Sequence, residues 1–260
     1  MLYLLLGLFA GFLAGLLGVG GGLVIVPVLV FIFSAQHFPE ASILHLALGT
    51  SLGSIIFTSI SSLRAHHAHG AVDWHIVRTI TPGIVTGTLL GSVLAAQLST
   101  HFLKVFFVVF LFYVGTQMLL NIKPKPTHKL PGLGGMFAAG NVIGSVSSLV
   151  GIGGGTLSVP FMTWCNVKMH QAIGTSAAIG FPIAVAGAAG YVANGLAVKG
   201  LPQYSLGFVY LPALAGVVLA SMLTAPLGAK LAHKLPVGKL KKIFAILLYT
   251  LGVKMAWSLF

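Results

Sequence analysis

Two clusters of glycine are the part of this sequence with the clearest potential for chemistry. They comprise Gly18, Gly20, Gly21 and Gly22 near the start of the chain and Gly151, Gly153, Gly154 and Gly155 near its middle. Within a bilayer, unwound backbone is tolerated only where it is buried in protein or lines a cavity, because its N–H and C=O groups need partners. We therefore expect each cluster to break a helix, so that the free N–H groups and dipole of the following helix attract an anion. The alternative is that the glycines serve only close helix packing.

Paired hydroxyl groups form the second candidate element. Thr50 and Ser51 in one part of the chain match Thr175 and Ser176 in another, and a glycine precedes each pair. Such hydroxyls can donate hydrogen bonds to the oxygens of a carboxylate or sulfonate. They can equally bond to the carbonyl group one turn back in their own helix. Their occurrence at matching positions favours a shared role in substrate binding.

Further polar residues that could contact the substrate are His45, His170, Arg64 and Asn194. The histidines precede the hydroxyl pairs and could carry a proton, although a histidine near the end of a segment is often interfacial. Asn194 could instead bridge helices. Three histidines follow Arg64, at positions 66, 67 and 69. A solvated basic loop explains them better than a metal site, and we predict no metal and no cofactor.

The composition places these residues in a membrane protein. Of the 260 residues, 57% are hydrophobic and 6% are charged, whereas soluble domains carry about 25% charged residues. The formal net charge of +12 is typical of either nucleic-acid binding or the cytoplasmic loops of a membrane protein. Because the basic residues lie in short gaps between long apolar runs, the lipid bilayer is the expected partner and nucleic acid is excluded.

Enzymatic catalysis has little support in the sequence. Glu40 and Asp73 are its two carboxylate residues, and both lie in or near loops, so chemistry by paired acids is excluded. The lone Cys165 cannot form an intramolecular disulfide. Neither glycine cluster continues into the GK[ST] ending of a phosphate-binding loop. A carboxylate inside the membrane would repel an anion and is costly there, so the scarcity of acidic residues suits an anionic substrate.

Apolar segments of two lengths carry these residues. A helix needs about 20 apolar residues to cross the hydrocarbon core, and the segments that reach this length are 43–63, 75–97, 102–121, 171–196, 204–229 and 243–260. The shorter ones are 2–17, 23–34, 133–149 and 156–166. The short segments form two pairs, each separated by a glycine cluster. Such interrupted segments in matching positions of two halves indicate broken helices and a transport site.

The two halves of the chain are duplicates. GLLGVGGGLVIVPVL from Gly15 aligns with SLVGIGGGTLSVPFM from Ser148, HLALGTS aligns with HQAIGTS, and AHG aligns with ANG. Matches in the same order predict an internal repeat. The expected divisions are an N-terminal transmembrane repeat at 1–121, a cytoplasmic linker at 122–131 and a C-terminal transmembrane repeat at 132–260.

The positions of the basic residues predict the topology. Placing Arg64, Arg78, Lys168 and the lysines of the linker and last loop in the cytoplasm follows the positive-inside rule. This arrangement requires an odd number of crossings in each half, with both termini non-cytoplasmic. The expected fold is therefore an all-α membrane protein with two inverted repeats of about five helical segments, each opened by a short glycine-broken helix pair.

These motifs resemble the sulfite exporter TauE/SafE family of membrane permeases. The resemblance rests on the duplicated GxGGG-x4-P element, the AxGTS element and HAHGAVDWHIVRTITPGIVTGTLLGSVLAAQLS from His67 to Ser99, and it covers nearly the whole chain. It implies transport of sulfite, sulfonates such as sulfoacetate, or other small anions. The glycine clusters, Pro27, Pro160 and the threonine–serine pairs fall on the shared pattern. The second half departs from it, because the region corresponding to Val72 to Trp74 reads AVKGLPQY with an insertion.

The resulting hypothesis is a multi-pass transporter of the bacterial inner membrane that moves a small anion by alternating access. The alternatives are an anion-selective channel and a membrane scaffold or accessory subunit that transports nothing by itself. A homodimer remains open. Saturating flux would distinguish the transporter from the channel.

Overall fold

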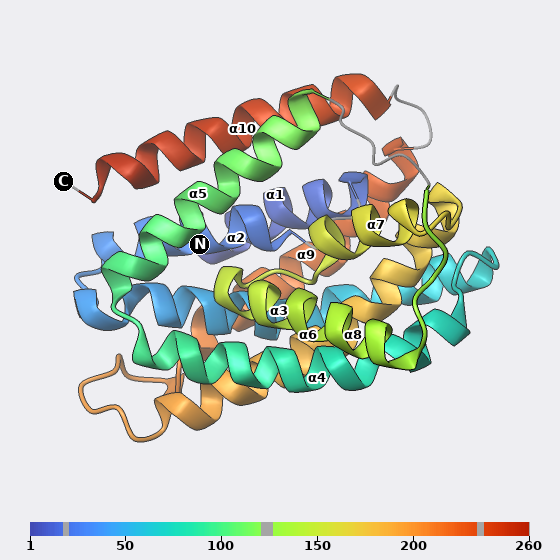
Figure 1. The fold of residues 1–260 in the computed structure, drawn as a ribbon. Helices are drawn as coiled ribbons and strands as arrows, with labels where there is room; N and C mark the ends of the chain where they lie inside the picture. Colours follow the sequence, from blue (N-terminus) through green and yellow to red (C-terminus); the bar gives the residue numbers. More distant parts are fainter. Residues whose placement is uncertain (18–20, 121–126, 233–236, 260) are drawn as a thin grey trace.

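The computed structural model describes residues 1–17, 21–120, 127–232 and 237–259. Within these ranges the chain is helical with a single small hairpin, which confirms the all-α prediction (Figure 1). The first half contains α1 (Leu2–Leu17), α2 (Gly22–Ala35), α3 (Glu40–Ala68), α4 (Trp74–Gln97) and α5 (Thr100–Leu119). The second half contains α6 (Leu133–Val150), α7 (Gly155–Trp164), α8 (Met169–Gly195), β1 (Ser205–Leu206), β2 (Val209–Tyr210), α9 (Leu211–Ala232) and α10 (Val237–Trp257).

Several helices have the length and composition of membrane spans. Among the described residues these are α3, α4, α5, α6 and α8. The sequence predicted that 133–149 would be too short to span, but α6 has 18 residues and is about 27 Å long at 1.5 Å per residue. Its partner α7 has only 10 residues. The broken pair of the second half therefore joins a helix of spanning length to a short one.

The apolar run expected at 204–229 begins with a hairpin instead of a helix. Ser205 pairs with Tyr210 and Leu206 with Val209 in an antiparallel ladder, and α9 begins only at Leu211. Gly207, in the turn, has a φ of 56°, a left-handed conformation that glycine adopts at little cost. Hydropathy could not reveal this turn, because the residues around it are apolar.

Helices α3 and α8 form the centre of the fold. Within the most apolar 18-residue stretch of each helix, the buried share is 78% in α3 and 67% in α8, but only 39% in α5. Large apolar side chains of the outer helices are exposed, as with Leu133 at 75% and Leu223 at 71%. An apolar exterior of this kind is suited to lipid rather than water. The central helices therefore hold the protein core, and the outer ones face the bilayer.

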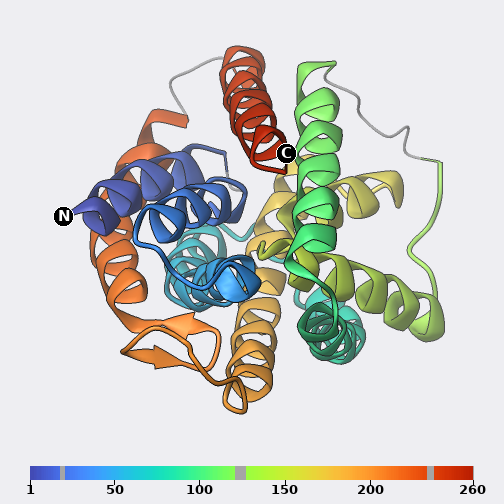
Figure 2. The same cartoon turned by 90° about the vertical axis from the view of Figure 1, so that its left-hand side faces the viewer.

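Helices pair across the two halves (Figure 2). The main contacts join α1 with α9, α6 with α4, α3 with α8, and α5 with α10. Small residues allow the first two pairs to approach closely. A Cβ atom on Gly7 of α1 would stand 2.6 Å from the Val217 carbonyl oxygen, and one on Gly140 of α6 would stand 2.5 Å from the Ile80 carbonyl oxygen. Gly7 and Gly140 occupy the same position in the two repeats, so they make equivalent contacts with the opposite half.

Candidate functional site

Each glycine cluster lies between two helices. Gly21, with a φ of 73°, precedes α2, and Gly154, with a φ of 76°, precedes α7. The first N–H groups of a helix have no partner within that helix. Because glycine has no side chain, neither Gly21 nor Gly154 can accept a hydrogen bond from them with a side-chain atom. The predicted helix breaks are therefore present. Gly18 and Gly20, which belong to the first cluster, lie outside the described residues.

The two breaks contact each other. A Cβ atom on Gly22 would collide with the carbonyl oxygen of Gly151 and would lie 3.1 Å from the Cα atom of Ile152. Ser51, on α3, donates a hydrogen bond of 2.8 Å to the same Gly151 oxygen. Only glycine at position 22 allows this approach, so close packing, the alternative reading of the clusters, accounts for that residue.

The two threonines connect the halves in equivalent ways. Thr50 Oγ1 accepts a 3.0 Å hydrogen bond from the backbone N–H of Tyr210, and Thr175 Oγ1 accepts one of 2.9 Å from the N–H of Asp73. Each bond reaches the residue that precedes a helix of the opposite half, α9 or α4. Acceptance uses a lone pair and leaves the hydroxyl proton available. These bonds also show that the counterpart of Asp73 is Tyr210, the last residue of the hairpin, and not a residue of AVKGLPQY.

The second break carries a connected pair of buried serines. Ser158 on α7 is placed to donate to the Gly154 carbonyl oxygen at 2.9 Å and to Ser176 Oγ at 2.8 Å. Since a hydroxyl has one proton, Ser158 can serve one acceptor at a time. Ser176 is thereby linked to the residue that precedes α7.

Three other hydroxyls at the second break are buried without a partner. The Oγ atoms of Ser147 and Ser148 on α6, and Oγ1 of Thr156 on α7, have no hydrogen bond among the described residues. Ser147 is fully buried, and Thr156 is 7% exposed. Ser147 Oγ lies 3.4 Å from the position that a Cβ atom on Gly154 would occupy. Buried polar atoms nearly always have partners, so the hydroxyls of Ser147 and Thr156, beside the N-terminus of α7, can receive one. The side chain of Ser148 instead faces Gly91 of α4.

The sequence analysis missed Ser147, Thr156 and Ser158. A signal was available in the aligned repeat, because Thr156 and Ser158 replace the Leu23 and Ile25 of the first copy. The identities in the alignment point to the glycines, whereas the positions at which the two copies differ in polarity point to these hydroxyls.

The remaining sequence candidates do not converge on the breaks. His45 is buried and donates through Nε2 to the Ala95 carbonyl oxygen at 2.9 Å, while His170 is exposed. Asn194 donates to Gly190 of its own helix at 2.7 Å. Arg64 is exposed and lies about 20 Å along α3 from Ser51 at 1.5 Å per residue.

The described residues contain no cluster of three or more histidine, cysteine or acidic side chains suited to a metal. Within the histidine-rich end of α3, His67 Nδ1 accepts a 3.3 Å hydrogen bond from the indole N–H of Trp74. His69 Nδ1 donates to the carbonyl oxygen of Ala65 in its own helix at 2.7 Å. These side chains are occupied by local bonds.

The sequence that forms this arrangement matches one family of membrane proteins. The family model for "Sulfite exporter TauE/SafE" matches residues 3–255. The chain belongs to the sulfite exporter TauE/SafE family. This membership confirms the resemblance seen in the motifs, and it makes the chain an integral, multi-pass membrane protein of a transporter family rather than an enzyme.

Relatives of this TauE/SafE protein carry similar names. A "Probable membrane transporter protein" of Haemophilus influenzae is 39% identical over 257 residues, covering 98% of this chain and 97% of the relative. The "Probable membrane transporter protein YunE" of Bacillus subtilis is 27% identical and covers 99% and 97%. A probable membrane transporter of Methanocaldococcus jannaschii is 25% identical and covers 98% and 94%. No solved structure matches the chain.

Proposed function

We propose that this TauE/SafE protein moves a small anion, sulfite or an organic sulfonate, across the membrane by alternating access, and that the anion binds at the second helix break. The observation that carries the proposal is the pair of buried, unpartnered hydroxyls of Ser147 and Thr156 beside the uncapped N-terminus of α7. The family description, which names a sulfite exporter, supports the choice of substrate class.

The chemistry of this site fits an oxyanion. The N–H groups of Gly155 and Thr156 open α7, and the positive end of the helix dipole favours negative charge there. The hydroxyls of Ser147 and Thr156 add neutral donors, which can bind each oxygen of a sulfite or sulfonate. Hydrogen bonds to a charged partner contribute about 1.5–3 kcal/mol each. Binding by neutral donors also avoids burying a permanent positive charge when the site is empty.

The site must open for an anion to enter. Ser147 is fully buried and Thr156 is 7% exposed, and we take this closed arrangement to be the occluded one. We assign the movement to the contact between the breaks, where Gly22 meets Gly151 and the two halves can rock. Gly21, Gly22, Thr50 and Ser51 then belong to the surface between the halves, and Gly153 to Gly155 with Ser176 belong to the anion site.

We also propose that the repeats are inverted, with both termini on the non-cytoplasmic side of a bacterial inner membrane. The direction of equivalent helices supports this. In Figure 1, α5 runs from left to right and its counterpart α10 runs back from right to left. Equivalent helices that point in opposite directions are what two oppositely oriented repeats require.

Sulfite flux into liposomes that contain the purified protein tests the proposal. We expect Ser147→Ala to reduce the apparent affinity for sulfite about 10-fold, since one hydrogen bond to a charged partner is lost. Ser145→Ala is the matched control, because Ser145 lies on the same helix but donates to Gly87 of α4 at 2.9 Å. Equal affinities in the two variants would contradict the site, and flux that never saturates would indicate a channel.

A further inference from the structure

Two neighbouring cavities lie where α10 meets helices of the first half, α2 and α5 for one cavity and the starts of α3 and α5 for the other. The larger, of about 870 Å³, is an apolar groove lined by Phe31, Leu119, Ile246, Tyr249, Val253 and Trp257. The smaller, of about 360 Å³, is lined by Glu40, Thr100, His101 and Lys104. Ser258 borders both cavities, so the groove and the polar pocket lie next to each other.

The groove has the length of one lipid leaflet. From Ile246 to Trp257 it follows 11 residues of α10, about 17 Å at 1.5 Å per residue. Half of the hydrocarbon core measures about 15 Å. The side chains of Ile246 and Val253 are 61% and 55% exposed, so the groove opens towards the membrane and not towards the protein core. A hydrocarbon chain fits both its length and its polarity.

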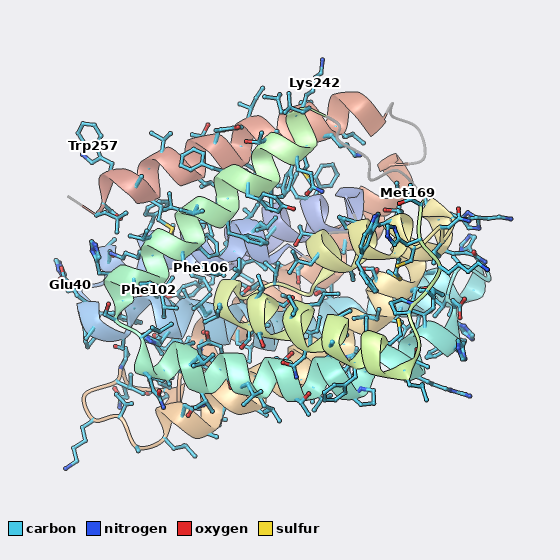
Figure 3. The ribbon with its side chains drawn as sticks, viewed as in Figure 1. Glu40, Phe102, Phe106, Met169, Lys242 and Trp257 are labelled. Atoms are coloured by element: carbon cyan, nitrogen blue, oxygen red, sulfur yellow. The ribbon has the colours of Figure 1, made fainter. Side chains whose placement is uncertain are left out.

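The polar pocket lies at the end of the molecule where a hydrocarbon chain in the groove would meet its headgroup. Glu40 and Trp257 are both at the left end of the molecule in Figure 3, and tryptophan is enriched at the boundary between hydrocarbon and headgroups. Lys254, one turn before Ser258, places its Nζ atom 4.5 Å from the centre of the Phe31 ring. The lining therefore changes from apolar to charged near the expected boundary between the hydrocarbon core and the lipid headgroups.

The pocket carries charges of both signs. Lys104 and His101 can donate hydrogen bonds to a phosphate, whereas the Glu40 carboxylate can bind an ammonium group. Thr100 is already occupied, because its Oγ1 donates to the Ala41 carbonyl oxygen at 2.5 Å. A headgroup with phosphate and amine matches both signs, while a purely anionic headgroup would meet Glu40 with repulsion.

We propose that the groove and the polar pocket together bind one aminophospholipid, with an acyl chain along α10 and the phosphoethanolamine headgroup between Lys104, His101 and Glu40. Phe31, Glu40 and Lys104 belong to the first half, and α10 belongs to the second. A bound lipid would therefore join the two halves at their outer edge and favour the arrangement seen in this structure. This inference does not depend on which anion is transported.

Native mass spectrometry of the purified protein with phosphatidylethanolamine or phosphatidylglycerol tests the lipid site. We expect one phosphatidylethanolamine to be retained, and Lys104→Ala to reduce its retention at least 5-fold. Lys199→Ala, which changes an exposed lysine of a loop outside the pocket, should leave retention unchanged. Glu40→Gln should shift the preference towards phosphatidylglycerol.

A second pair of variants tests the groove separately from the headgroup. Val253→Trp would fill the groove, and we expect it to abolish retention of the lipid. Val142→Trp is the control, since Val142 is an exposed residue of α6 at 64% that lies outside the groove. Retention that is unchanged in both Lys104→Ala and Val253→Trp, or that shows no headgroup preference, would overturn the proposal. Circular dichroism confirms that each variant is folded.

Discussion

The two helix breaks have the same backbone design and opposite polarity. Both use a left-handed glycine, Gly21 or Gly154, to start a short helix. In the first break the residues that follow are Leu23 and Ile25, which are buried in the apolar core. In the second break the equivalent positions hold Thr156 and Ser158. The duplicated glycines therefore supply the scaffold twice, and the buried hydroxyls that follow them are found in the second copy.

The hydrogen bonds of the paired serines differ in the same sense. Ser51 bonds across the halves to Gly151, whereas its counterpart Ser176 bonds within its own half to Ser158. One serine therefore fixes the contact between the halves, and the other extends the polar group of the second break. Equivalent residues of a repeat need not have equivalent functions.

The largest effect is expected for Gly154→Leu. A side chain at a φ of 76° is strained, and the left-handed conformation costs about 1–2 kcal/mol. The added Cβ atom would also collide with Cδ1 of Ile183, and overpacking costs a further 1–3 kcal/mol. We expect a loss of about 3 kcal/mol in the free energy of unfolding and of all sulfite flux, measured by thermal unfolding and in liposomes.

Gly153→Ala is the control for that variant. Its Cβ atom would lie 3.2 Å from Cγ2 of Ile55, a contact that a small shift of the isoleucine relieves. We expect little change in stability. If Gly154→Leu were tolerated as well as Gly153→Ala, the left-handed start of α7 would not be required.

The threonine bonds should give a smaller and equal effect in the two halves. Thr50→Val and Thr175→Val each leave a backbone N–H, that of Tyr210 or Asp73, without its acceptor. An unsatisfied buried donor costs about 1–3 kcal/mol, and because these two bonds are partly buried the lower end of that range applies. We expect both variants to lower the melting temperature by similar amounts. A large loss in only one of them would show that the halves are held together unequally.

The serine pair should separate stability from binding. Ser51→Ala removes the bond to the Gly151 oxygen and should cost about 1 kcal/mol of stability without changing the affinity for sulfite. Ser176→Ala should weaken sulfite binding instead, because Ser176 belongs to the polar group at α7. Thermal unfolding and a binding titration of both variants measure the two quantities. The reverse result would move the anion site to the first break.

The smallest effect is expected for Arg64→Gln and His170→Gln. Both side chains are exposed, and surface substitutions usually change stability by less than about 0.5 kcal/mol. We expect near-normal sulfite flux in liposomes. Loss of flux in either variant would restore the direct role that their positions in the sequence suggested.

Much of the fold follows from the sequence, because the glycine clusters and apolar runs depend on local patterns. The pairing of Thr50 with Tyr210 does not, since the inserted hairpin separates the equivalent residues in the alignment. The sequence also could not predict that His45 is buried and His170 exposed, because matched positions in a repeat acquire different neighbours. The unpartnered Ser147 could be recognised only in the folded structure, where its hydroxyl lies beside Gly154.

The most direct test of the anion site is calorimetric titration of sulfite and sulfoacetate into the purified protein in nanodiscs. The comparison is between the unmodified chain and the double variant Ser147→Ala with Thr156→Val, which removes two hydroxyls that have no partner in the described structure. We predict that the variant folds normally and that its Kd is about 100-fold higher, since two hydrogen bonds to a charged ligand are lost. An unchanged Kd in a folded variant would contradict binding at the second break.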